Sequence, residues 1–257
     1  MVMISLRNLV LALDGREVVS GITADLTGGQ LIGIIGPNGA GKSTLVRGML
    51  GLLPAVSGEV RIDGHRIEDI PPGDRARRLA YLPQGQHLHW PLTVERLVAL
   101  GRLPYLGPLS RMGGMDREAV NEAMRRTEVA HLAQRTVTEL SGGERARVMV
   151  ARALAVGAGG FLADEPLASL DPGHQIDMMT LLEREAREGA LVVVVLHDLT
   201  MAARHCGRVL LMNRGRVVAD GPPDAVMTSR NLSEVYGIKA YLHHVDGLQS
   251  VIALGRG

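Results

Sequence analysis

Short, purely apolar runs alternate with stretches of helical periodicity through most of the chain. The runs 31–35, 161–163 and 191–196 have the length and the aliphatic content of buried strands. Between and after them, apolar residues recur every three or four positions, which predicts helices. The predicted helices span 42–53, 144–155 and 174–188. Strands that alternate with helices over 31–210 predict an α/β sheet that is largely parallel, with right-handed crossovers.

Glycine-containing turns mark antiparallel hairpins on both sides of that region. One turn lies within residues 1–30, a second follows the extended stretch 60–62, and a third joins two extended stretches near the C-terminal end of the alternating region. The turns are Asp14-Gly15, Asp63-Gly64 and Asn213-Arg214-Gly215. The sequence therefore predicts an N-terminal antiparallel β subdomain beside the parallel sheet.

The pattern changes after the candidate strand 79–82. From about residue 85 to about residue 150, apolar residues at helical spacing predict a helical insertion. They are Val94, Leu97, Val98, Val120, Ala123 and Met124. Asp116 is the expected N-cap of the second of these helices, and the stretch 104–113 is the expected mobile loop. No internal repeat, low-complexity tract or linker divides the sequence, so we expect a single domain over 1–257.

Composition narrows the class of protein. Hydrophobic content is 46%, charged content is 21% and the net charge is +1, so no global charge attracts the chain to nucleic acid or to an anionic membrane. The single cysteine, Cys206, excludes an internal disulfide framework and fits a reducing compartment. The longest aliphatic run, 191–196, is far shorter than a membrane span. With no basic-then-apolar signal at the N-terminus, we expect a soluble cytoplasmic protein that reaches a membrane only through a partner.

Gly36-Pro-Asn-Gly-Ala-Gly-Lys-Ser43 fits the pattern G-x-x-x-x-G-K-[ST] of a phosphate-binding P-loop. It follows a predicted strand and precedes a predicted helix, which is the context that such a loop requires. Its glycines let backbone N–H groups turn toward phosphates, Lys42 adds a positive charge, and Ser43 offers a hydroxyl to Mg²⁺. Because only Lys42 and Lys239 are lysines, a chance match to this pattern is improbable.

Polar residues end two of the predicted strands. Asp164, after 161–163, is expected to hold Mg²⁺ or its water ligand, and Glu165 to polarise an attacking water. His197, after 191–196, could donate a hydrogen bond to a γ-phosphate. The alternatives are a solvated acidic turn and a structural histidine. The P-loop upstream favours the functional interpretation of Asp164 and Glu165, and the position of His197 relative to Glu165 favours a functional histidine.

Ser141-Gly-Gly-Glu144 opens a predicted helix. Its free N–H groups and the positive end of the helix dipole would form an anion site. The alternative is an ordinary serine cap, which any globular protein could carry.

Taken together, these segments resemble an ATP-binding cassette (ABC) protein, and the likeness covers nearly the whole chain. Six motifs occur in the family's order. They are Walker A at Gly36–Thr44, the Q-loop at Gln84, the signature at Leu140–Glu144, Walker B at Phe161–Glu165, the D-loop at Ser169–Asp171 and the switch histidine His197. The resemblance implies a P-loop NTPase (RecA-like) core and a head-to-tail dimer. In that dimer, the signature of one copy meets the ATP that Lys42 of the other copy holds.

The resemblance also assigns roles to individual residues. Glu165 and His197 are the implied catalytic residues, and Ser43, Gln84 and Asp164 are the implied ligands of Mg²⁺. The implied ATP-binding residues are Gly36, Pro37, Asn38, Gly39, Ala40, Gly41, Lys42, Ser43, Thr44, Gln84, Ser141, Gly142, Gly143 and Asp171.

A finer similarity points to importer subunits of the iron-siderophore, heme and vitamin B12 type. The similar stretches are 79–84, 92–102, 197–203 and 235–237. This resemblance implies three partners, which are a second copy of the chain, transmembrane permease subunits and, indirectly, an external substrate-binding protein. It implies no nucleic acid, and it places the chain on the cytoplasmic face of the cell membrane. The segment 86–92, which contains Trp90, is expected to contact a partner, whereas His87 and His89 lack the pattern of a metal site.

The chain departs from the family pattern at three positions. Leu13 stands where an aromatic residue usually stacks on adenine, so base binding would depend on apolar contacts from Leu13 and Val18. Ala168 replaces a serine of the D-loop, and Ala146 stands where a glutamine often follows the signature. None of these changes touches Lys42 or Glu165, so we expect an active ATPase.

Two other classes of protein could carry a P-loop. ABC ATPases that act on DNA or ribosomes usually have coiled-coil or zinc insertions, or two cassettes in one chain, and this sequence has none of these. A kinase or GTPase would not need the signature motif, and the guanine-reading pattern N-K-x-D is missing from the sequence.

Overall fold

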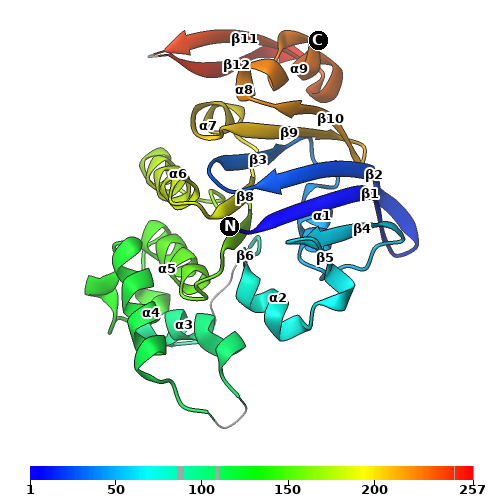
Figure 1. Cartoon of the computed structure of the whole chain (residues 1–257). Coiled ribbons are helices and arrows are strands. Elements are labelled where there is room, and N and C mark those ends of the chain that lie inside the picture. Colours follow the sequence, from blue (N-terminus) through cyan, green and yellow to red (C-terminus); the bar gives the residue numbers. More distant parts are fainter. Residues whose placement is uncertain (86–89, 108–109, 246, 257) are drawn as a thin grey trace.

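A six-stranded sheet forms the centre of the computed structural model, which describes residues 1–85, 90–107, 110–245 and 247–256 (Figure 1). The strand order is β10-β9-β3-β8-β7-β6, and all neighbours are parallel except β9 and β10. The strands are β3 (Leu31–Ile35), β6 (Leu79–Leu82), β7 (Gly160–Asp164), β8 (Leu191–Val195), β9 (Arg208–Asn213) and β10 (Arg216–Gly221). Strands β3, β7 and β8 are buried along their whole length, as their continuous apolar runs predict. The predicted α/β class is confirmed.

A second, antiparallel sheet covers one face of the central sheet, and the helix α1 (Lys42–Met49) lies between the two sheets. Its order is β2-β1-β4-β5, and its strands are β1 (Met3–Leu13), β2 (Arg16–Thr27), β4 (Ser57–Ile62) and β5 (His65–Arg66). Leu6, Leu11 and Met49 share one buried cluster with Ile34 of the central sheet. The helix ends at Met49 and not at residue 53 as predicted, since Gly51 takes a positive φ of 65° just after it.

Three helices cover the opposite face of the central sheet, α5 (Gly142–Leu154), α6 (Pro172–Arg187) and α7 (Leu199–His205). Val148, Met179 and Ala202 join them to the strands in a second buried cluster. The sequence predicted α5 and α6 to within two residues at each end. The first of the two clusters contains Ala40 of the P-loop and Leu45 of α1 together with residues of both sheets, so the P-loop and its helix lie between the two sheets.

The helical insertion stands between β6 and β7, as predicted. It consists of α3 (Val94–Ala99), the 3-10 helices η2 (Leu100–Tyr105), η3 (Ala130–Leu132) and η4 (Val137–Glu139), α4 (Gly114–Arg126) and α5. The prediction that Asp116 caps α4 is wrong. Gly113 is the N-cap, and Asp116 sits three residues into the helix, where its carboxylate accepts a hydrogen bond from the Gly113 N–H at 3.0 Å. Of the predicted loop 104–113, Pro104 and Tyr105 belong to η2, and residues 108–109 lie outside the described residues.

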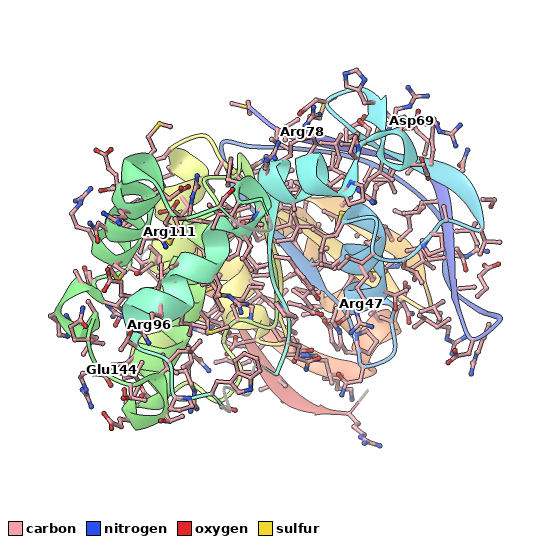
Figure 2. All side chains as sticks on the ribbon, turned by 90° about the horizontal axis from the view of Figure 1, so that it is seen from below. Arg47, Asp69, Arg78, Arg96, Arg111 and Glu144 are labelled. Atoms are coloured by element: carbon pink, nitrogen blue, oxygen red, sulfur yellow. The ribbon has the colours of Figure 1, made fainter. Side chains whose placement is uncertain are left out.

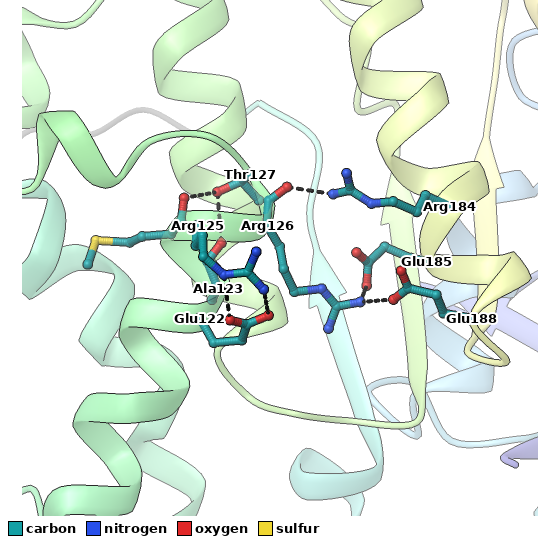
Figure 3. Close-up of polar contacts among 9 residues, drawn as sticks. Glu122, Ala123, Arg125, Arg126, Thr127, Arg184, Glu185 and Glu188 are labelled. Atoms are coloured by element: carbon teal, nitrogen blue, oxygen red, sulfur yellow. Dashed lines mark hydrogen bonds and ion pairs between the residues drawn. The ribbon is translucent and has the colours of Figure 1, made fainter.

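Polar contacts tie the end of α4 to α6 (Figure 3). The Arg126 guanidinium donates to Glu185 at 2.5 Å and to Glu188 at 2.7 Å. In the other direction, Arg184 donates to the carbonyl oxygen of Arg126 at 2.5 Å. The Glu185 side chain is only 3% exposed, so this ion pair is largely shielded from water. The insertion is therefore anchored to the core by a buried charge.

The C-terminal region forms elements that the sequence did not predict. The helices α8 (Pro223–Val226) and α9 (Ser229–Tyr236) lead to a hairpin of β11 (Ile238–Val245) and β12 (Leu248–Arg256). The hairpin packs on α7 and α9, and Thr200 donates to the Val251 carbonyl at 3.1 Å. The short helix α2 (Pro72–Arg78) precedes β6. No helix among the described residues is long and apolar enough to cross a bilayer.

Candidate active site

The P-loop joins the end of β3 to the start of α1 and passes close to neighbouring backbone. Gly36 has a φ of 152°, and a Cβ atom there would lie 2.3 Å from the Met212 carbonyl oxygen. Gly41 has a φ of 96°, and its Cβ would lie 2.9 Å from the Val18 carbonyl oxygen. Only glycine fits these two positions, because any side chain would meet backbone that cannot move aside. The predicted strand, glycine loop and helix are all present.

Lys42 is held inside this loop. Its Nζ donates to the carbonyl oxygens of Gly36 at 2.7 Å and Pro37 at 3.0 Å, and the residue is 6% exposed. Burial lowers the pKa of Lys42, and the nearby carboxylates of Glu165 and Asp164 act in the opposite direction. An ammonium has three N–H donors, so one remains for an anion bound in the loop.

Ser43 and Asp164 meet beside the loop. The Ser43 hydroxyl donates to Oδ1 of Asp164 at 2.9 Å, and Asp164 is 1% exposed. Oδ2 of Asp164 is buried and has no hydrogen-bond partner among the described residues, and burial raises the pKa of this carboxyl group. A hydroxyl oxygen beside an unpaired carboxylate oxygen is a donor set that Mg²⁺ accepts. The residues present therefore fit a magnesium ion.

Each of three neighbouring parallel strands is followed by a polar residue, and these three residues are hydrogen-bonded to one another. Gln84 follows β6, Glu165 follows β7 and His197 follows β8. Nε2 of Gln84 donates to Oε2 of Glu165 at 2.5 Å, and Nε2 of His197 is hydrogen-bonded to Oε1 of the same carboxylate. Glu165 adopts a φ of 53°, a left-handed conformation that is strained for a residue with a side chain. The carboxylate is thus fixed from both sides at the carboxyl edge of the sheet.

A groove with a volume of about 770 Å³ runs along the P-loop. Leu13 and Val18 line it, as do Glu165 and His197. The sequence analysis missed four further lining residues, which are Arg16, Glu17, Arg214 and Gly215.

The turn between β9 and β10 reaches the groove through its contacts with the P-loop and with β2. The Gly215 N–H donates to the Ala40 carbonyl at 3.0 Å, and the Gly215 carbonyl accepts from the Ser20 N–H at 2.8 Å. The sequence identified this segment only as a hairpin turn. Its contact with the P-loop depends on tertiary structure, and no local signal encodes it.

The signature segment caps α5 and does not line the groove. The Ser141 hydroxyl accepts from the Glu144 N–H at 3.3 Å, and the Glu144 carboxylate accepts from the Ser141 N–H at 2.8 Å. This reciprocal capping box uses the N–H groups of Ser141 and Glu144 and does not involve those of Gly142 and Gly143. Figure 2 shows Glu144 on α5 at one end of the molecule and Arg47 on α1 well away from it. Asp171, at the start of α6, does not line the groove either.

The central sheet is mostly parallel, and a P-loop, an acidic strand end and a histidine lie together at its carboxyl edge. This combination defines a P-loop nucleotidase. The comparison with known families is more specific. Residues 19–168 match the family described as ABC transporter, and the chain belongs to this family. Members of this family bind ATP and hydrolyse it to power transport, and the chain is an ATPase of this kind.

Curated relatives cover almost the whole chain. The hemin import ATP-binding protein HmuV of Streptomyces coelicolor is 45% identical over 242 residues, which cover 93% of this chain and 86% of the relative. The ferric enterobactin transport ATP-binding protein FepC of Escherichia coli is 37% identical, with 96% of this chain and 93% of the relative covered. Among solved structures, a metal-chelate type ABC transporter in an inward-facing conformation matches with a TM-score of 0.86 at 23% identity. That match covers 99% of this chain and 98% of the other, and it shows the fold alone.

Proposed function

We propose that this chain is the ATPase subunit of an importer for an iron-bearing chelate, of the hemin or ferric-siderophore class. The similarity to hemin import and ferric enterobactin transport subunits supports this substrate class. ATP hydrolysis is supported by one observation above all, the hydrogen-bonded group of Gln84, Glu165 and His197 beside the P-loop. A second candidate from the sequence, an ABC ATPase that acts on DNA or ribosomes, has no observation in its favour.

Each residue of the site has a proposed role in hydrolysis. The P-loop N–H groups and Lys42 bind the triphosphate. Glu165 orients a water molecule and accepts its proton while the water oxygen bonds to the γ-phosphorus and the bond to ADP breaks. His197 holds the Glu165 carboxylate and reaches the γ-phosphate.

Mg²⁺ is the proposed metal, and it would neutralise charge on the phosphate oxygens. Ser43 and Asp164 would hold it, the latter through the unpaired Oδ2 atom. Gln84 could join them through its amide oxygen, because the hydrogen bond to Glu165 uses only its amide N–H.

A second copy of the chain is the proposed partner that completes the site. Ser141, Gly142 and Gly143 present a helix start that lies outside the groove of their own chain. Helix N-termini bind anions, so this one is suited to a phosphate held elsewhere. Two copies arranged head to tail would place each signature against the nucleotide of the other copy. Two ATP molecules would then lie between the subunits.

Permease subunits are the partners through which an ABC ATPase is attached to the membrane. We place their docking site on the face seen in Figure 2, between Arg47 of α1, Arg78 of α2 and Arg96 of α3. Leu52 and Leu103 expose 63% and 59% of their surface, and Trp90 exposes 75%. A pocket of about 320 Å³ at Leu52 and Tyr81 lies between α1 and α2. Of the segment 86–92, residues 86–89 lie outside the described residues. We infer that docking holds the chain on the cytoplasmic face, where an external binding protein is reached only through the permease.

The proposed function is tested in vesicles that contain the chain and its permease. ATP enclosed on the side of this subunit should drive uptake of hemin or of a ferric siderophore, and Glu165→Gln in the same vesicles should abolish uptake. ATP hydrolysis without uptake of either chelate would refute the substrate class. Hydrolysis that Glu165→Gln leaves unchanged would refute the proposed catalytic site.

A further inference from the structure

The segment 165–171, which ends in the D-loop Ser169–Asp171, connects β7 to α6 in a strained conformation. Glu165 and Ser169 have φ values of 53° and 64°, which are unfavourable for residues with side chains. The start of α6 holds the far end of the loop. Asp171 accepts a hydrogen bond from the His174 N–H at 3.1 Å, and the Gln175 side chain donates to the Leu170 carbonyl at 3.1 Å. The conformation of the loop therefore depends on the first turn of α6.

His174 contacts the D-loop and the start of α5 at once. Its Nδ1 donates to Oδ2 of Asp171 at 2.5 Å, which lowers the pKa of that carboxyl group. The other edge of the ring lies against Gly143 of the signature. A Cβ atom on Gly143 would lie 2.1 Å from Cδ2 and 2.4 Å from Nε2 of His174. The ring therefore occupies the space that any side chain at position 143 would need.

Around this contact, the packing between α5 and the D-loop is incomplete. A pocket of about 190 Å³ lies between α5 and the segment 165–171, lined by Gly142 and Met149 of α5 and by Pro166 and Ser169 of that segment. A Cβ on Gly142 would come no nearer to the Ser169 carbonyl oxygen than 3.9 Å. The His174 ring leaves less room beside Gly143 than Ser169 leaves beside Gly142. The His174 side chain is 41% exposed, so the ring is not simply part of the core.

We propose that His174 is a positioning residue, which fixes the signature relative to the D-loop so that both reach the partner's nucleotide together. This role rests on the proposed two-copy site. A signature free to turn against the D-loop would have to be ordered when the dimer closes, and that ordering costs affinity. His174 removes the cost in advance, because one ring holds Asp171 through its Nδ1 atom and Gly143 through its opposite edge.

ATP-driven dimerisation tests the role. In a Glu165→Gln background, His174→Ala should weaken dimerisation about tenfold. It should leave ATP affinity of the single subunit unchanged, because His174 does not line the groove. His244→Ala is the matched control, since His244 forms another histidine–aspartate pair, with Asp224 at 3.1 Å, on the C-terminal hairpin. It should change neither quantity.

Two conservative variants separate the two contacts. His174→Asn keeps a donor for Asp171 but loses the ring, whereas His174→Phe keeps the ring but loses the donor. Each should recover part of the dimerisation that His174→Ala loses. Equal dimerisation by the Ala variant and its Glu165→Gln parent would overturn the positioning role. A parent that binds ATP and never dimerises would overturn the two-copy site and this role with it.

The contact itself is tested by thermal stability, without a partner. Gly143→Ala should lower the melting temperature when His174 is present, because the methyl group and the ring cannot share the space. In a His174→Ala background the same change should be neutral or stabilising, since alanine favours a helix. An equal loss in both backgrounds would overturn the interlocking of Gly143 and His174.

Discussion

Arg126→Ala removes the cation that compensates a buried carboxylate at the junction of α4 and α6. The variant leaves Glu185, which is 3% exposed, without its ion-pair partner, while Glu188 at 55% exposure simply returns to water. Removal of one partner of a fully buried ion pair costs roughly 3–5 kcal/mol. Arg126 itself is 31% exposed, so the site is partly solvated and the cost should be lower. We expect a loss of about 2 kcal/mol in the free energy of unfolding, a factor of about 30 in the folded-to-unfolded ratio.

The loss should depend on pH in a defined direction. Burial already raises the pKa of Glu185 above its ordinary 4.5, and the Arg126 charge acts against this rise. Without Arg126 the folded-state pKa rises further. A carboxyl group with a raised folded-state pKa favours folding below its unfolded pKa, and this contribution is lost as the pH climbs through the folded value. Arg126→Ala should therefore be less damaging at pH 5 than at pH 7.5.

Urea unfolding at these two pH values measures both effects. Arg125→Ala is the matched control, because Arg125 is the adjacent residue of α4 and pairs with Glu122 at exposures of 72% and 47%. Such an exposed pair contributes little to stability, because water screens both charges. Glu185→Gln added to Arg126→Ala should abolish the pH dependence and recover part of the stability. If Arg126→Ala costs no more than Arg125→Ala at either pH, the buried-charge reasoning is refuted.

Further predictions concern the nucleotide site. Glu165→Gln should bind ATP, hydrolyse it at least about 100-fold more slowly and accumulate as an ATP-loaded dimer; unchanged turnover in a phosphate-release assay would remove Glu165 from the proposed role. Leu13→Tyr should tighten ATP binding by about 2- to 10-fold in equilibrium titration, since an aromatic ring in the groove can stack on the base. It should leave the affinity for inorganic tripolyphosphate unchanged, and an equal gain for both ligands would show that the base is not what Tyr contacts.

The parts of the fold that the sequence predicted have strong local signals. The strands β3, β7 and β8 are continuous apolar runs, and the P-loop has glycines at positions that exclude any Cβ atom. The C-terminal hairpin was not predicted, because its strands alternate weakly and because β12 packs on α7, which is far away in sequence. The N-cap of α4 was assigned to Asp116 and not to Gly113, because an aspartate at the third helical position resembles a cap in sequence.

In the site, too, the sequence predicted the residues that have a local signal and missed those that only tertiary contacts bring in. The apolar runs before Gln84, Glu165 and His197 predicted that each of these residues follows a strand. Parallel pairing of the three strands brings their ends together. Arg214 was missed because only the tertiary contact of Gly215 with Ala40 brings its turn to the groove. His174 was missed for a similar reason, since its partner Gly143 lies 31 positions earlier in the sequence, on another helix.

A complementation experiment tests the central claim, that each ATP is held between the P-loop of one copy and the signature of another. Lys42→Ala disables the first surface and Ser141→Arg the second, and neither variant alone should hydrolyse ATP with its permease. A mixture of the two contains dimers with one intact composite site, so it should recover about a quarter of the parent activity if pairing is random. A mixture that stays as inactive as its components would contradict the account.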